Sequence, residues 1–271
     1  MRMAASKASS GAAAVAEPLL HVDGLTKRFG GVVPADAITL AISPGEVHAV
    51  IGPNGAGKTT LIGLLSGEIS PQQGRIRFDG EDITQLPVHR RSRLGLARSF
   101  QITSLLAGFT ALDNVALAVQ AHRGHSFRFW RDARREQDLR EPALAALDRV
   151  GLADRAGVRV ERLSHGEHRQ LEIAMALATQ PRLLLLDEPM AGMGPDESAQ
   201  MVRMLQKLKG SMTIMLVEHD MEAVFALADR LTVLVYGRII ASGDPAAVRE
   251  DAGVRQAYLG EKDSGQGALH G

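Results

Sequence analysis

Apolar and polar residues alternate in short steps over residues 19–51, which is the period of strands that bury one face. Ile38, Leu40 and Ile42 share one face of such a strand, because successive side chains in a strand point to opposite sides. A turn is predicted at Pro44-Gly45. The first part of the chain is therefore expected to consist of short β-strands.

The pattern then changes from a strand to a helix within a few residues. The apolar run 47–51 predicts a buried strand, and the apolar positions within 61–65 predict an amphipathic helix that ends at Gly67. Residues 75–78 alternate arginine with an apolar side chain before Asp79-Gly80. That pattern favours an edge strand followed by a turn.

Residues from about 103 to 162 have the apolar spacing of helices. Thr110 and Asp113 resemble a capping box at the start of one helix. Pro142 suits the first turn of a second helix, which we expect to end at Gly151. The apolar side chains of this second helix are Leu144, Leu147 and Val150.

Strands and helices alternate again after Ser164. The apolar run Leu183–Leu186 predicts a central parallel strand, and Met212–Val217 predicts another buried strand. Between them, Pro195 opens a helix that Gly210 closes. The apolar face of that helix consists of Met201, Met204, Leu205 and Leu208, which we interpret as core.

Composition narrows the class of protein. The 271 residues are 45% hydrophobic but only 4% aromatic, so the core must be largely aliphatic. Lys+Arg and Asp+Glu both number 31, and this neutral balance argues against a general nucleic-acid binder. The chain has no cysteine, which excludes disulfides and thiolate chemistry. No apolar run reaches the about 20 residues that span a bilayer.

Candidate chemistry begins in the glycine-rich segment between the predicted strand and helix. It reads G-x-x-x-x-G-K-T, a loop that cradles phosphates with its backbone N–H groups. Its residues are Gly52, Pro53, Asn54, Gly55, Ala56, Gly57, Lys58 and Thr59, followed by Thr60. Lys58 supplies a charge to the β- and γ-phosphates, and the Thr59 hydroxyl suits Mg²⁺. This segment predicts a nucleotide site.

Two further motifs suit the same chemistry. Asp187-Glu188 directly follows a buried strand, where one carboxylate can reach Mg²⁺ and the next can accept a proton from attacking water. Ser164 and Glu167 fit the S-x-x-E capping box of a helix, and a capped helix start can also bind an anion. Asp187 is assigned to the metal and Glu188 to the base.

Taken together, these motifs resemble the ATP-binding cassette (ABC) family of transport ATPases. The family signature L-S-G-G-Q is matched here by Leu163–Glu167, with His165 and Glu167 as departures. The resemblance implies a P-loop NTPase fold of the RecA-like type, with an N-terminal antiparallel β subdomain and a helical insert. The expected organisation is a tail at 1–18, the ATPase domain at 19–262 with its helical part at about 103–162, and a C-terminal tail at 263–271.

The resemblance also implies how the residues act. Two cassettes pack head to tail, so Ser164 and Gly166 act on the partner's nucleotide. Gln101 senses Mg²⁺ and the attacking water, and His219 contacts the γ-phosphate. Phe29 matches the aromatic residue that stacks on adenine, although a core position in a strand is the alternative. The family often has an aspartate at the position of Gly194, so a contact across the dimer lacks its usual side chain here.

Several short sequence segments indicate a particular branch of the family. Residues 97–101, 171–174, 187–195 and 258–261 resemble the ATP-binding subunits of importers for branched-chain amino acids and their relatives for urea, amides and aromatic acids. Such a subunit lies peripherally on the cytoplasmic face of the inner membrane. Its partners are a second cassette, identical or related, two permease subunits and, indirectly, a substrate-binding protein.

Three alternatives stay open at this point. Exporters of lipid or polysaccharide share the core motifs, as do soluble cassettes that act on DNA or ribosomes and nucleotide-binding regulators without turnover. The basic, aromatic stretch 122–135 is either a solvated helical face or a surface near the permease or the anionic inner leaflet.

Overall fold

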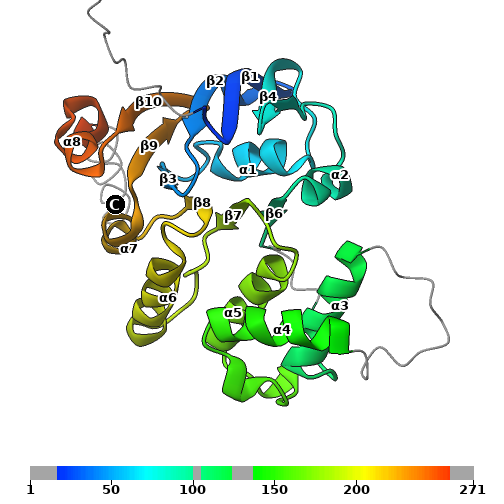
Figure 1. Ribbon diagram of the computed structural model, residues 1–271. Helices are drawn as coiled ribbons and strands as arrows, with labels where there is room; N and C mark the ends of the chain where they lie inside the picture. The colour runs from blue at the N-terminus through cyan, green and yellow to red at the C-terminus, as the bar shows by residue number, and fades with distance from the viewer. Residues whose placement is uncertain (1–16, 100–104, 124–136, 257–271) are drawn as a thin grey trace, which may run out of the picture.

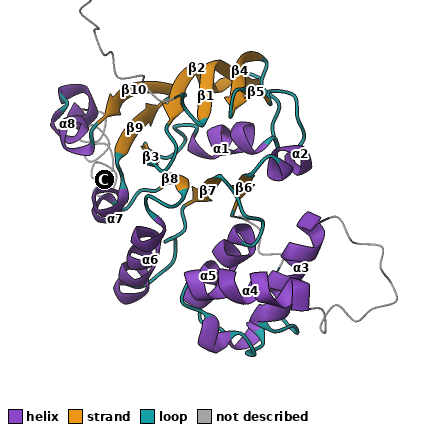
Figure 2. Ribbon diagram, viewed as in Figure 1, coloured by secondary structure: helices purple, strands orange, loops and turns teal. Residues whose placement is uncertain are grey.

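The computed structural model describes residues 17–99, 105–123 and 137–256, and contains two β-sheets (Figures 1 and 2). The first sheet is antiparallel, with strand order β2-β1-β4-β5. Its strands are β1 (Leu20–Phe29), β2 (Val32–Ile42), β4 (Gln73–Phe78) and β5 (Glu81–Asp82). Residues 20–42 thus form two paired strands, as their period predicts, but at 10 and 11 residues these strands are longer than the short strands expected.

The second sheet has strand order β10-β9-β3-β8-β7-β6, and all its neighbouring pairs are parallel except β10 with β9. Its strands are β3 (Val47–Ile51), β6 (Leu96–Arg98), β7 (Leu183–Asp187), β8 (Thr213–Val217), β9 (Arg230–Val235) and β10 (Arg238–Gly243). The two sheets confirm the predicted P-loop NTPase class with an antiparallel β subdomain.

Helices cover both faces of the parallel sheet. The α-helices of the described residues are α1 (Lys58–Ser66), α2 (Val88–Arg93), α3 (Ala111–Arg123), α4 (Gln137–Arg149), α5 (His165–Leu177), α6 (Pro195–Leu208), α7 (Met221–Leu227) and α8 (Pro245–Glu250), of which α3 and α4 pack against each other and against α5. Helix α1 lies between the two sheets, whereas α5 lies across the parallel sheet from it (Figure 1). None of the helices in the described ranges is long and apolar enough to cross a membrane.

The four leucines of β7 show why this strand is apolar throughout. Leu183 and Leu185 pack into the core that surrounds α1, and Leu184 and Leu186 pack into the core beneath α5 and α6. All four are fully buried, because a parallel strand with helices on both faces has no solvent-facing side. The methionine stripe of α6 is buried in the second of these cores, as predicted.

Three local predictions about caps hold. Asp113 N–H donates to Thr110 Oγ1 (3.1 Å) while Thr110 N–H reaches Asp113 Oδ2 (3.4 Å), which is the reciprocal pattern of a capping box. Ser164 and Glu167 form a second capping box at the start of α5. Gly67 ends α1 in a left-handed conformation.

The prediction that Pro142 opens a helix is wrong. Helix α4 already begins at Gln137, so Pro142 lies inside it. A proline there cannot donate to the carbonyl four residues earlier, that of Asp138. The guanidinium of Arg123, at the end of α3, donates to this carbonyl instead (2.8 Å). A neighbouring helix therefore satisfies the group that the proline leaves unpaired.

Two smaller corrections follow. Strand β4 is not at the edge of its sheet, because the two-residue strand β5 pairs with its outer side. Leu144 is 41% exposed on α4 rather than buried with Leu147. Of the basic stretch 122–135, residues 124–135 lie outside the described residues, as do 258–261.

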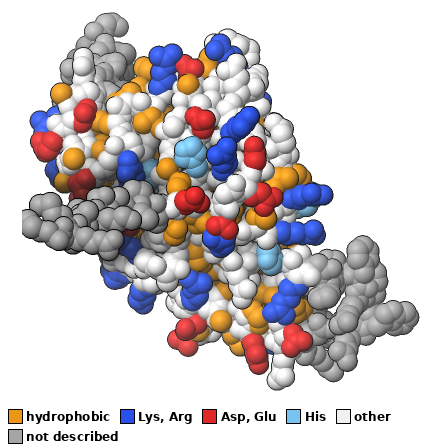
Figure 3. All heavy atoms as spheres, turned by 45° about the horizontal axis from the view of Figure 1, so that its top comes forward, with side chains coloured by type: hydrophobic (Ala, Val, Ile, Leu, Met, Phe, Trp, Pro, Cys, Tyr) orange, Lys and Arg blue, Asp and Glu red, His pale blue; other side chains and the backbone are white. Residues whose placement is uncertain are grey.

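On the face in Figure 3, basic and acidic side chains are interspersed rather than separated. This agrees with a formal net charge of zero.

Candidate functional site

The strand order of the parallel sheet brings three chain segments together. Strand β8 lies between β3 and β7, and in register Val217 pairs with Val50 on one side and with Asp187 on the other. Just beyond this row, Glu188 N–H donates to Val217 O (2.9 Å). The segments that follow β3, β7 and β8 therefore leave the sheet side by side. Ligands of α/β proteins bind at this carboxyl edge.

The glycine-rich loop leaves β3 at this edge and is packed too tightly for side chains at two of its glycines. A Cβ on Gly57, whose φ is +106°, would lie 1.9 Å from Pro34 O of the antiparallel sheet. A Cβ on Gly52 would lie 2.1 Å from Leu234 O of β9. The loop is thus held between both sheets, and its backbone can approach a phosphate closely.

Lys58 begins α1 and is 8% exposed. Its Nζ donates to Gly52 O (2.6 Å) and Pro53 O (3.0 Å), so the ammonium lies inside the loop. Thr59 and Thr60 follow in the first turn of the helix. An ammonium and the N-terminus of a helix both favour a bound anion, so this loop has the features of an anion-binding site.

Asp187 ends β7 with its side chain 3% exposed. Burial raises the pKa of this carboxyl, and Glu188 raises it further, while Arg98 and Lys58 act against the rise. Arg98 Nη2 contacts Asp187 Oδ2 at 3.1 Å. A buried carboxylate near Lys58 and the phosphate loop is a hard oxygen ligand of the kind that Mg²⁺ prefers.

Glu188 has a φ of +49°, a conformation that side-chain-bearing residues seldom adopt. Such strain persists only where the surroundings hold the backbone, and it is typical of active sites. On the neighbouring segment, the His219 side chain is 65% exposed. The structure therefore brings Lys58, Asp187, Glu188 and His219 to one edge of the sheet.

Ser164 and Gly166 lie elsewhere, at the start of α5. Ser164 Oγ donates to Glu197 Oε1 of α6 (3.3 Å), and Gly166 N–H donates to the same oxygen (3.2 Å). The small cavity around them is lined by Ser164, Gly166, Glu167, Gln170, Glu197, Gln200 and Met201. None of these residues belongs to the glycine-rich loop, so within one chain the two motifs form separate sites.

Phe29 is 51% exposed at the end of β1, which excludes the alternative that it is a core residue. The Lys27 ammonium lies 5.1 Å from the centre of its ring. Gly194 precedes α6 with an extended backbone and makes no side-chain cap. Gln101 lies outside the described residues.

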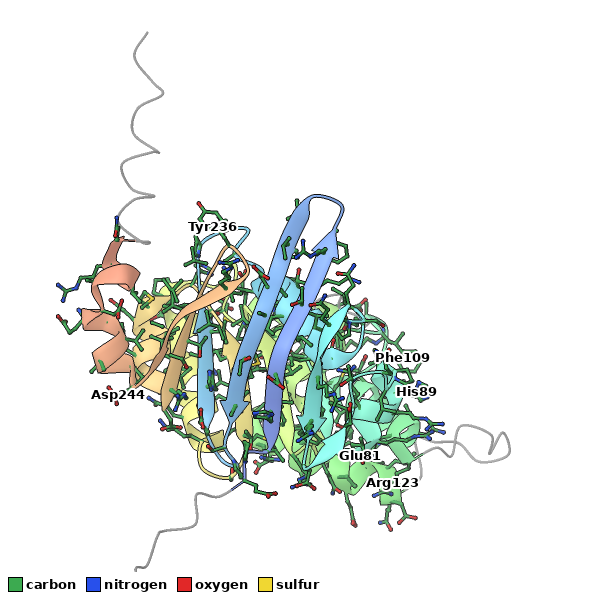
Figure 4. All side chains as sticks on the ribbon, turned by 90° about the horizontal axis from the view of Figure 1, so that it is seen from above. Glu81, His89, Phe109, Arg123, Tyr236 and Asp244 are labelled. Atoms are coloured by element: carbon green, nitrogen blue, oxygen red, sulfur yellow. The ribbon has the colours of Figure 1, made fainter. Side chains whose placement is uncertain are left out.

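The turn after β9 also contacts the loop. Gly237 N–H donates to Ala56 O (2.8 Å), and Tyr236, labelled in Figure 4, is exposed beside it with a φ of +47°. This turn helps to fix the glycine-rich loop from a segment about 180 residues later in the chain. Sequence periodicity gives no sign of such a contact.

Three charged residues at these sites went unpredicted: Arg98, Glu197 and Glu218. Glu218 could have been found, because it follows an apolar strand just as Asp187 does. Arg98 contacts Glu68 and Asp187, which are 30 and 89 positions away, and Glu197 contacts Ser164, which is 33 positions away. No local pattern reports contacts of that kind.

Comparison with known protein families gives two matches. Residues 35–191, more than half the chain, match the family described as ABC transporter. Residues 238–264 match the family described as branched-chain amino acid ATP-binding cassette transporter.

Individual relatives agree. The high-affinity branched-chain amino acid transport ATP-binding protein BraF of Pseudomonas aeruginosa is 39% identical, over 91% of this chain and 100% of that protein. Its counterpart LivG of Escherichia coli is 35% identical over the same shares. The solved ADP conformation of the ABC transporter cassette MJ1267 has a TM-score of 0.79 and 28% identity, over 90% of this chain and 99% of that one.

The fold, the phosphate loop between a strand and a helix, and these matches agree with one another. The chain belongs to the ATP-binding proteins of the ABC transporter family, in its branched-chain amino acid group.

Proposed function

We propose that the chain hydrolyses Mg-ATP to drive an importer of branched-chain amino acids or related small polar solutes, through a separate permease. The observation that supports this most is the convergence of Lys58, Asp187, Glu188 and His219 on one sheet edge beside the phosphate loop. The named relatives are transport ATP-binding proteins for that class of solute.

The loop and Lys58 hold the β- and γ-phosphates, and Phe29 stacks on the adenine. Glu188 accepts the proton of the attacking water, because its carboxylate extends from the segment beside the loop. His219 contacts the γ-phosphate, and its side chain is 65% exposed at this edge of the sheet. Gln101 is proposed to report the state of the site to the permease.

The donor set also fits Mg²⁺. Asp187 provides a buried carboxylate and Thr59 a hydroxyl, and Mg²⁺ in nucleotide sites takes one or two protein oxygens together with phosphate oxygens. The ion would neutralise charge that develops on the phosphates. Because burial raises the pKa of Asp187, a nearby cation would also favour its ionised form.

Two copies are needed to complete the site. Ser164 and Gly166 are separated from the loop of their own chain, which supports the proposal that they act on the nucleotide of a second cassette. In one chain, both groups donate to Glu197 instead. A γ-phosphate arriving from the partner would compete with this carboxylate for the same donors.

Replacing Glu197 by glutamine should therefore ease pairing. We expect the ATP concentration for half-maximal dimer formation to fall by about fivefold, because one negative charge near the incoming phosphate is removed. The assay is light scattering of a Glu188→Gln background, in which the ATP-bound dimer accumulates. Asp196→Asn is the matched control, since it makes the same charge change on the exposed side of the same helix start. Equal shifts for both variants would contradict the prediction.

The transport proposal is tested in proteoliposomes that contain this chain with permease subunits of a branched-chain amino acid importer from the same organism. A binding protein loaded with leucine, isoleucine or valine should stimulate ATP hydrolysis and solute uptake. Urea and a short amide test the related importers, and a Lys58→Ala chain gives the background. Stimulation by a lipid substrate, with none by these solutes, would identify an exporter instead.

A further inference from the structure

A fully buried carboxylate joins the two segments that carry Glu188 and His219. Glu218, the first residue after β8, has 0% exposure. Its Oε1 accepts the Met190 N–H (3.0 Å), and Met190 lies in the turn that follows Glu188. Its Oε2 accepts the N–H groups of His219 (2.9 Å) and Asp220 (3.4 Å). The two oxygens of one side chain thus serve two different segments.

These contacts bear on the groups proposed to act on ATP. Glu188 has a left-handed backbone, which must be held by its surroundings. The turn 188–191 is closed by the bond from Ala191 N–H to Glu188 O (3.1 Å), and Glu218 fixes this turn through Met190. On the other side, Glu218 Oε2 also lies 3.5 Å from Nδ1 of His219.

We propose that Glu218 is a positioning residue for ATP hydrolysis. It holds the segment that contains Glu188 and the segment that contains His219 in a fixed position relative to each other. A movement of either segment is therefore transmitted to the other. Glu218 does not itself contact the nucleotide. This inference rests on the proposed ATPase function but not on the identity of the transported solute.

The chemistry of the contact explains why glutamate is needed. A carboxylate has two acceptor oxygens, so it can face N–H donors on both sides at once. In glutamine one of these oxygens becomes an NH₂ group, which would face an N–H donor on one side and release that segment. Aspartate keeps both oxygens but is one methylene shorter, so it cannot span the two segments.

The test uses the full-length chain with the substitutions Glu218→Gln and Glu218→Asp. Because small displacements of catalytic groups are costly, we expect kcat to fall about 10- to 100-fold in both variants. The Kd for ATP should stay within about threefold of the parent, since the phosphate loop is unchanged. Hydrogen exchange should become faster in segments 188–191 and 218–220.

Glu172→Gln provides the matched control. Glu172 is also a buried carboxylate, but it pairs with Arg169 within α5 and contacts neither segment. Burial raises the pKa of its carboxyl, so a neutral amide is well suited to that site. The Glu172→Gln variant should have the kcat of the parent and the same hydrogen-exchange rates in segments 188–191 and 218–220.

A second measurement keeps the proposal testable if Glu218→Gln lowers stability. If Glu218 acts through the two segments, Glu218→Gln should lower kcat by a much smaller factor in a His219→Ala background than in the parent. Unchanged kcat in Glu218→Gln, full activity in Glu218→Asp, or additive losses in the double variant would each overturn the proposal. If the parent chain itself hydrolyses no ATP, the proposed function fails first and this inference falls with it.

Discussion

Replacing Glu188 by glutamine is expected to lower ATP turnover by about 100-fold or more and to leave ATP binding intact. Glutamine has nearly the same size and hydrogen-bonding reach, but it cannot accept the proton of the attacking water. Glutamate and glutamine both have a side chain, so the strain of the left-handed backbone at position 188 (φ +49°) is the same in the variant. The loss therefore reports chemistry rather than folding.

Steady-state phosphate release at saturating Mg-ATP measures this effect, and light scattering detects the ATP-bound dimer that should accumulate. Glu161→Gln is the control, because Glu161 is a half-exposed carboxylate in the short helix before the α5 capping box. The proposed role of Glu188 would be wrong if its glutamine variant turned over ATP at the parent rate. A variant that no longer binds ATP would also argue against a role confined to proton transfer.

The largest loss of stability is expected at Arg91. This side chain is 1% exposed on α2, and its guanidinium donates to Leu64 O and Leu65 O (both 2.7 Å) at the end of α1. It also donates to Leu86 O (2.8 Å) and Thr84 O (3.0 Å). Burial lowers the pKa of Arg91 to about 10, so the side chain is still charged at neutral pH. A cation here also suits the negative end of the helix that carries the phosphate loop.

Arg91→Met should reduce the free energy of unfolding by about 3–5 kcal/mol, because three buried carbonyls and one partly buried carbonyl lose their donor. The melting temperature should fall by about 10 °C. Urea unfolding and calorimetry measure the two quantities. Arg90→Met makes the same substitution at an exposed position of the same helix and should change stability little. Equal stability of the two variants would show that the buried bonds contribute nothing net.

The elements of the fold could be predicted where a local pattern specifies them. The alternation in 38–42, the apolar run 183–186 and the capping pair Ser164 and Glu167 all formed the structures they indicate. The start of α4 could not be predicted around Pro142, because the bond that accommodates this proline comes from Arg123 on another helix. Local sequence rules indicate that a proline inside a helix is destabilising, but they do not identify a distant group that compensates for it.

By itself, the sequence determined which chemical groups this protein carries. A glycine-rich loop with Lys58, and acidic residues placed just after apolar strands, are set by neighbours along the chain. Only the tertiary structure decided which of these groups meet. The order β3-β8-β7, the contact of Glu218 with both adjoining segments and the enclosure of Arg91 join residues that are distant in the chain or on separate elements. Such contacts follow from how whole strands and helices pack, and packing has no period that can be found in the sequence.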